Sequence, residues 1–98
     1  MLEINLQSKF KLNEEFILHQ IEELDKYWLF NIVNGDIFNL NDVSMFILQK
    51  ISEGNNFESL VFELLQQFDV DNDRAHNDLQ RILQKLFHEK IISQIKED

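Results

Sequence analysis

The sequence predicts an α+β fold, with a three-stranded antiparallel sheet followed by three helices. Residues 27–33 and 36–40 are apolar, β-branched and aromatic runs on either side of Asn34-Gly35, a dipeptide typical of a tight type I′ turn. Three stretches with a helical spacing of apolar residues follow between residues 42 and 89. Strands that precede helices, without alternating with them, indicate helices packed on an antiparallel sheet.

The expected strands lie within the first 40 residues. Residues 2–6 alternate apolar and polar side chains, which predicts a short extended segment. The first full strand is expected at residues 15–22, where apolar residues are dense and acidic residues follow. The hairpin around Asn34-Gly35 would supply the second and third strands.

The register of the hairpin decides which side chains share a face. A two-residue turn pairs Val33 with Asp36, Ile32 with Ile37, and Leu29 with Leu40. One face then carries Trp28, Phe30, Ile32 and Ile37, and the other carries Tyr27, Leu29, Val33, Phe38 and Leu40. Because both faces are largely apolar, the sheet must be covered on both sides or be partly covered by a partner. The last strand, residues 36–40, is expected to be an open edge, which can recruit a peptide.

Three helices are expected after residue 41. Asn41 is a favourable N-cap and Asp42 complements the helix macrodipole, so the first helix is expected at residues 42–52. Asn56 is expected to cap the second helix, and the third is expected to run from residue 73 to residue 89. Apolar residues that fall off the core stripes are Met45, Leu48 and Phe62. The first helix is therefore either central or carries an exposed apolar spot.

The order of strands and helices fits a variant of the winged helix-turn-helix. With 98 residues and 44% hydrophobic content, the chain is long enough for one domain and too short for two. We expect a single domain at residues 1–98, with its core at about 15–92.

Charge and composition exclude several classes of function. A net charge of −9 repels phosphate backbones and anionic lipids, so neither a nucleic acid nor a membrane is an expected partner. No apolar run approaches the roughly 20 residues that span a bilayer, and the N-terminus lacks the features of a signal peptide. The absence of cysteine excludes disulfides, thiolate metal sites and thiol nucleophiles. These features favour a cytoplasmic protein.

Candidate catalytic and metal-binding residues do not form a recognisable motif. Asp69, Asp71 and Asp73 alternate as in the opening of a calcium loop, but Arg74 and Gln80 stand where that loop needs Gly and Glu. Two isolated glycines cannot make a phosphate-binding loop, and no serine has a histidine and an acid at a motif spacing. We therefore expect no enzyme activity, no metal and no cofactor.

The third expected helix is basic on an otherwise acidic chain. Arg74 and Asp78, and Lys85 and Glu89, have the i,i+4 spacing of helix ion pairs, which leaves Arg81 and Lys90 without a partner. Alternatively, Arg81 and Lys85 flank a groove and attract acidic residues of a bound peptide.

Three short patterns follow one another along the chain in a characteristic order. They are NGDIFNLN with Phe38, Leu40 and Asn41, then Phe57-Glu58-Ser59-Leu60, then Asp78 with Ile82-Leu83 and Leu86. In this order they resemble the pyrroloquinoline quinone biosynthesis protein D family, over roughly residues 15–92. The second resembles that family's Thr-Val-Glu-Glu-Leu helix start, and the third its Asp-x-x-x-Phe-Leu-x-x-Leu pattern. The chain departs at Lys90-Ile91-Ile92, where the family usually has Gly-Leu-Ile.

The resemblance implies a non-catalytic adaptor that binds the leader region of a ribosomally synthesised precursor peptide. It would present that peptide to a modifying enzyme, such as a radical S-adenosylmethionine protein or a leader peptidase. The leader would add as a strand beside residues 36–40, in a groove against the third helix. A winged-helix regulator that binds DNA is the alternative, and the open edge also allows a homodimer. The residues expected to contact the peptide are Asp36, Ile37, Phe38, Asn39, Leu40, Leu79, Arg81, Ile82, Leu83, Lys85 and Leu86.

Overall fold

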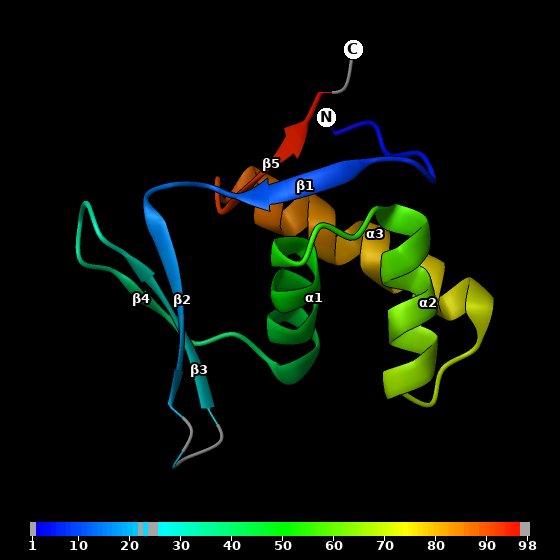
Figure 1. Ribbon diagram of the computed structural model, residues 1–98, viewed down its shortest axis with the longest axis horizontal. Coiled ribbons are helices and arrows are strands. Elements are labelled where there is room, and N and C mark those ends of the chain that lie inside the picture. The colour runs from blue at the N-terminus through cyan, green and yellow to red at the C-terminus, as the bar shows by residue number, and fades with distance from the viewer. Residues whose placement is uncertain (1, 22, 24–25, 97–98) are drawn as a thin grey trace.

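The structure is a computed structural model that describes residues 2–21, 23 and 26–96. In chain order the elements are β1 (Lys9–Leu12), β2 (Phe16–Ile21), β3 (Lys26–Asn31), β4 (Ile37–Phe38), α1 (Asp42–Ser52), α2 (Phe57–Gln67), α3 (Asn72–His88) and β5 (Ile92–Ile95). Figure 1 shows α1 between the sheet formed by β2, β3 and β4 and the helix α2. The predicted α+β class is confirmed.

The three-stranded sheet has the strand order β2-β3-β4 and is antiparallel throughout. In β2, Phe16 pairs with Asn31 and Leu18 pairs with Leu29. Leu29 is fully buried and Phe16 nearly so, which identifies their face as the core side of the sheet. The strand predicted at residues 15–22 corresponds to β2, although residue 22 lies outside the described residues.

The predicted hairpin register is wrong by two residues. Leu29 pairs with Phe38, and Phe30 pairs with Ile37, where the two-residue turn had required Ile32 opposite Ile37. The loop is longer because Asn31 closes it: its carbonyl oxygen accepts from the N–H of Gly35 at 2.8 Å, and its side chain accepts from the N–H of Val33 at 2.9 Å. Side chains alternate with a period of two, so a shift of two residues leaves every side chain on its predicted face.

A second sheet, which the sequence did not predict, joins the two ends of the described chain. Its strands β1 and β5 are antiparallel, with Phe10 opposite Gln94. The N-terminal segment expected to be extended contains a turn at residues 6–7 before β1 begins. Both Leu2 and Phe10 are buried, so the hydrophobic core extends to residues before 15.

The helices begin at the capping residues expected for α1 and α2. The side chain of Asn41 accepts from the N–H of Ser44, and the side chain of Asn56 accepts from that of Ser59. Such caps satisfy N–H groups that have no partner within the helix. The third helix begins one residue earlier than predicted, because the side chain of Asp71 caps it.

Helix α1 is central. Met45 and Leu48, which fall off its predicted stripe, are 3% and 1% exposed, so the alternative of an exposed apolar spot is wrong. The first helix can be apolar on opposite sides because the sheet, α2 and α3 enclose it (Figure 1). By contrast, Phe62 on α2 is 59% exposed.

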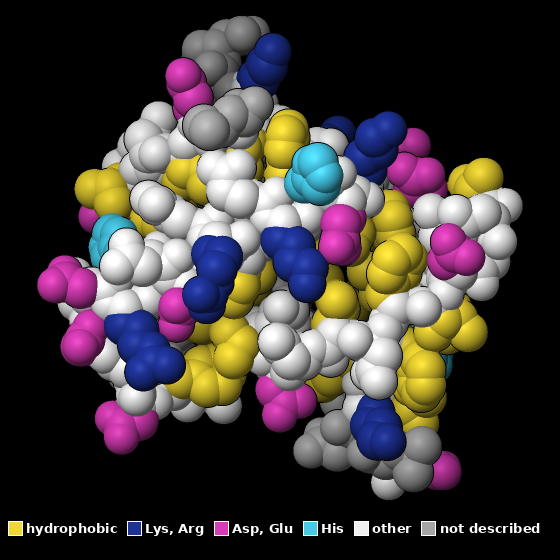
Figure 2. All heavy atoms as spheres, turned by 180° about the vertical axis from the view of Figure 1, so that it is seen from behind, with side chains coloured by type: hydrophobic (Ala, Val, Ile, Leu, Met, Phe, Trp, Pro, Cys, Tyr) yellow, Lys and Arg dark blue, Asp and Glu magenta, His cyan; other side chains and the backbone are white. Residues whose placement is uncertain are grey.

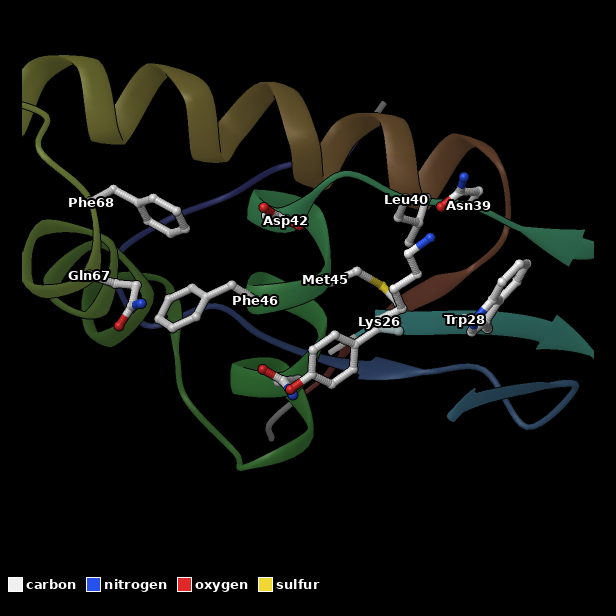
Figure 3. Close-up of a pocket in the computed structure, with 11 residues that line it drawn as sticks. Lys26, Trp28, Asn39, Leu40, Asp42, Met45, Phe46, Gln67 and Phe68 are labelled. Carbon is white, nitrogen blue, oxygen red and sulfur yellow. The ribbon is translucent and has the colours of Figure 1, made fainter. Parts of the chain in front are cut away.

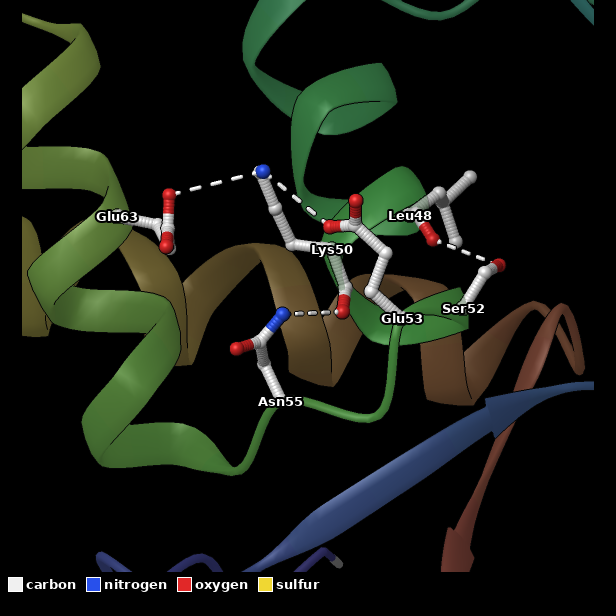
Figure 4. Close-up of polar contacts among 6 residues, drawn as sticks. All are labelled: Leu48, Lys50, Ser52, Glu53, Asn55 and Glu63. Atoms are coloured by element: carbon white, nitrogen blue, oxygen red, sulfur yellow. Dashed lines mark hydrogen bonds and ion pairs between the residues drawn. The ribbon is translucent and has the colours of Figure 1, made fainter.

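Polar contacts hold the end of α1 against α2 (Figure 4). The ammonium of Lys50 lies 3.2 Å from the Glu53 carboxylate and 3.6 Å from that of Glu63 on α2. The side-chain amide of Asn55 donates to the carbonyl oxygen of Lys50 at 2.8 Å. These contacts link the end of α1 to the turn that follows it and to α2.

Candidate peptide-binding groove

The strand β4 lies at one edge of the three-stranded sheet. On its inner side the N–H of Asn31 donates to the carbonyl oxygen of Asp36 at 2.8 Å. Because hydrogen bonding alternates along an antiparallel pair, the N–H and C=O groups of Phe38 also face β3, whereas those of Ile37 point outwards. Continued by one residue beyond β4, the same alternation directs the main-chain groups of Asn39 outwards. Within the described part of the chain no strand pairs with this outer side. The geometry offers main-chain partners to an added strand.

A groove of about 390 Å³ lies between the segment that follows β4, the start of α1, and α3. We call it the α3 groove. Its lining residues are Leu40, Asn41, Val43, Ser44, Asp78, Arg81, Ile82, Lys85, Leu86 and Glu89. Half-buried apolar side chains, among them Leu40, Val43 and Ile82, form its apolar surface.

The predicted contact residues fall into two groups. Leu40, Arg81, Ile82, Lys85 and Leu86 meet in the α3 groove. The wall residues Leu79 and Leu83 have no exposed surface and belong to the core, so they can act only as support behind the groove. Ile82 directly precedes Leu83 on α3, but only Ile82 lies at the margin of the buried face and reaches the groove.

The strand residues predicted to contact a peptide take different orientations. Asp36 and Asn39 are exposed, and Ile37 is 56% exposed on the sheet face away from the core. Phe38 points to the core side, where its ring centroid lies 5.8 Å from that of Phe16. A strand added beside β4 would therefore meet Ile37 on one face and the α3 groove on the other.

The basic side chains of α3 differ in their partners. Arg81 contacts Asp78 at 3.0 Å, and Arg74 contacts the same carboxylate at 3.6 Å. The expected pair of Arg74 with Asp78 is confirmed, whereas Arg81, expected to lack a partner, shares that carboxylate. The expected pair of Lys85 with Glu89 is not among the ion pairs of the described residues. Figure 2 shows Lys and Arg side chains gathered beside hydrophobic surface on the face behind that of Figure 1.

Five residues of the groove were not predicted to contact a peptide: Asn41, Val43, Ser44 and the two carboxylates Asp78 and Glu89. Asn41 was recognised only as an N-cap, which it is, since its side chain accepts from Ser44 at 2.8 Å. The alternation that marks strand residues ends at Leu40. The sequence nevertheless indicated the first three of these residues, because a helix cap soon after an edge strand places the first helical turn beside that edge.

The described residues contain no group of three or more His, Cys, Asp or Glu that could hold a metal ion. Of the acidic residues that resemble the opening of a calcium loop, Asp71 caps α3, and its side chain accepts from the N–H of Arg74. In the same part of the chain, no helix combines the length and apolar character needed to cross a membrane.

The sequence profile of Coenzyme PQQ synthesis protein D (PqqD) matches residues 26–92, more than half of the chain. The chain belongs to the PqqD family. The matched part of this PqqD-family chain includes β3, β4, all three helices and thus the whole α3 groove. None of the curated proteins matches its sequence.

Two solved structures share the fold of this PqqD-family chain. "Lasso peptide synthetase B1 complexed with the leader peptide" has a TM-score of 0.75 at 20% identity, and the alignment covers 87% of this chain and 98% of that one. "TbiB1 in Complex with the TbiA(beta) Leader Peptide" has a TM-score of 0.76 at 22% identity, with 89% and 99% covered. The alternative of a DNA-binding regulator has no support from these comparisons.

Proposed function

We propose that this PqqD-family chain binds the leader region of a ribosomally synthesised precursor peptide and presents it to a modifying enzyme. The observation that carries the proposal is the outward-facing edge of β4 directly beside the α3 groove. Both structural neighbours are complexes with leader peptides, which supports the same use of the fold. Family membership supports it independently.

The bound peptide would extend the sheet as a strand next to β4. Its main chain would pair with the outward N–H and C=O groups of Ile37 and Asn39. Its side chains would alternate between two surfaces, Ile37 on the outer face and the apolar wall at Leu40 and Ile82 in the α3 groove. Main-chain pairing supplies affinity, and the groove supplies specificity.

The electrostatic part of the recognition would come from α3. The Lys85 ammonium and the Arg81 guanidinium lie at the rim of the α3 groove. The side chain of Arg81 is 76% exposed, so it can turn from Asp78 towards a ligand. An acidic residue of the peptide would compete with Asp78, one of two carboxylates in the same lining, for these cations. Its attraction to them would raise both the rate of encounter and the affinity.

The chain would act as a non-catalytic adaptor. The family membership and the leader-peptide complexes of its structural neighbours support this role. The proposed recipient is a modifying enzyme, a radical S-adenosylmethionine protein or a leader peptidase, in the cytoplasm. A homodimer through the β4 edge would compete with the peptide, since both would use the same main-chain groups.

Amide chemical shifts of the labelled chain test the proposal. The leader segment of a precursor encoded beside this chain's gene is titrated into it. We expect the largest changes at residues 36–40 and on α3, because strand addition forms new hydrogen bonds at β4. Changes that avoid both regions would contradict the proposed groove, and the absence of any saturable change would contradict peptide binding. Duplex DNA serves as the comparison ligand, for which we expect no binding at physiological salt.

A further inference from the structure

A second hollow, of about 550 Å³, lies between the start of β3, helix α1 and the end of α2. We call it the β3–α1 hollow. Figure 3 shows Phe46, Gln67 and Phe68 at one end and Trp28, Asn39 and Leu40 at the other, with Met45 and Lys26 between them. No residue of α3 lines it, so it is distinct from most of the α3 groove.

Aromatic and polar side chains share its wall. The rings of Phe46 and Phe68 meet edge to face, with centroids 5.5 Å apart and an interplanar angle of 89°. Tyr27 and Trp28 add two further half-buried rings on the β3 side. Such walls favour another aromatic ring, because offset and edge-to-face contacts add to the burial of apolar surface.

Trp28, at one end of the hollow, has a buried polar atom without a hydrogen-bond partner. The indole Nε1 of Trp28 is the one buried side-chain polar atom of the described residues without a hydrogen bond. Because this atom is buried, a ligand in the hollow contacts the Trp28 ring and not its N–H, and the N–H proton reports on that contact. The cationic Lys26 and the anionic Asp42 both line the hollow, so it repels neither an acidic nor a basic ligand.

The hollow is continuous with the proposed peptide path. Leu40 lines both the β3–α1 hollow and the α3 groove, and Asn39, whose main chain points out from the sheet edge, also lines the hollow. A chain in extended conformation advances about 3.3 Å per residue, so few residues are needed to leave the β4 edge and enter the hollow.

We propose that the β3–α1 hollow is a second recognition subsite, which takes an aromatic side chain of the same precursor peptide next to its strand-forming segment. This inference rests on the proposed function, because the occupant is the peptide that adds to β4. The peptide would then contact both the α3 groove and the β3–α1 hollow, which share Leu40.

N-Acetyl-phenylalaninamide tests the hollow without any peptide. The chain contains a single tryptophan, so its indole N–H gives one unambiguous resonance. We expect a saturable shift of that proton as the added ring packs beside Trp28, with a Kd on the order of 1 mM. N-Acetyl-alaninamide, which has the same amides and no ring, should cause no saturable shift. Equal shifts with both compounds, or with neither, would overturn the inference.

A pair of variants locates the binding. Gln67 lines the hollow, and the neighbouring Gln66 does not; both are exposed on α2. We expect Gln67→Phe to fill the mouth and raise the Kd at least about tenfold, and Gln66→Phe to leave it unchanged. Equal effects of the two variants would contradict the subsite.

Peptide titration separates this inference from the proposed function. If a leader shifts residues 36–40 and α3 while the Trp28 indole and the Gln49 and Gln67 side-chain amides stay unmoved, the subsite is wrong and the proposed function stands. If the phenylalanine compound binds but no leader perturbs β4, the proposed function falls, and with it the peptide as the occupant.

Discussion

At the scale of single residues, the two cations at the rim of the α3 groove give the sharpest test of peptide recognition. Arg81→Glu combined with Lys85→Glu should weaken binding of an acidic leader at least about tenfold, because attraction becomes repulsion. Both side chains are exposed, so the thermal midpoint should change little. Isothermal titration calorimetry measures the affinity.

The matched control changes the charge by the same amount elsewhere. Lys11→Glu with Lys96→Glu alters two exposed lysines that do not line the groove. If this control weakens binding as much as the groove variant, net charge alone explains the effect and the rim has no specific role.

A second residue-scale prediction concerns Lys50, whose pKa is raised above its ordinary 10.5, chiefly by its hydrogen bond to Glu53 and also by Glu63. Because the folded-state pKa is the higher one, the stabilisation is fully present below pH 10.5 and is lost as pH rises through the folded-state value. The difference in thermal midpoint between wild type and Lys50→Gln should therefore be constant at neutral pH and shrink above pH 10.5. Lys11→Gln, at an exposed position, controls for the loss of one charge. A difference that grows with rising pH would contradict this assignment.

At the scale of elements, the outer edge of β4 is the part of the sheet on which the proposed function depends. Asn39→Pro removes an outward-facing N–H, and proline is tolerated where the N–H of an edge strand faces solvent. We expect peptide affinity to fall at least about tenfold, as a hydrogen bond is lost and the ring obstructs pairing. Asn39→Ala retains the N–H and should bind within about twofold of wild type. Similar losses in both variants would assign the effect to the side chain and contradict strand addition.

At the scale of the whole molecule, β1, which lies outside the family match at residues 26–92, completes the core together with β5, which begins at the last matched residue. Phe10, on β1, is 2% exposed and belongs to the same core cluster as Phe57 and Ile92. Phe10→Ala should lower the free energy of unfolding by about 3–5 kcal/mol, as measured by urea denaturation. Lys11→Ala, at the exposed neighbouring position, should change it by less than about 0.5 kcal/mol. A small effect of Phe10→Ala would show that the N-terminal strand is dispensable for the core.

The same scale shows what sequence patterns can predict of the site. The edge strand was predicted at residues 36–40, and the structure has a shorter one, Ile37–Phe38. The capped start of α1 and the amphipathic α3 were also predicted, and with Leu40 they bound the α3 groove. The assignment of individual α3 residues was less complete, since a helical stripe contains both residues that face the core and residues at its margin. Leu83 has no exposed surface, whereas its neighbour Ile82 reaches the groove. Helical periodicity alone does not separate the two.

The sequence by itself determined the α+β class, the bounds of α1, the caps at Asn41 and Asn56, and the two faces of the β3–β4 hairpin. Each of these depends on interactions between residues a few positions apart. Only the tertiary structure decided the hairpin register, the pairing of β1 with β5, and the burial of both sides of α1. These features depend on contacts between distant segments, such as Phe10 opposite Gln94, whose partners no local pattern specifies. The β3–α1 hollow is of this kind, because it exists only where β3, α1 and the end of α2 meet.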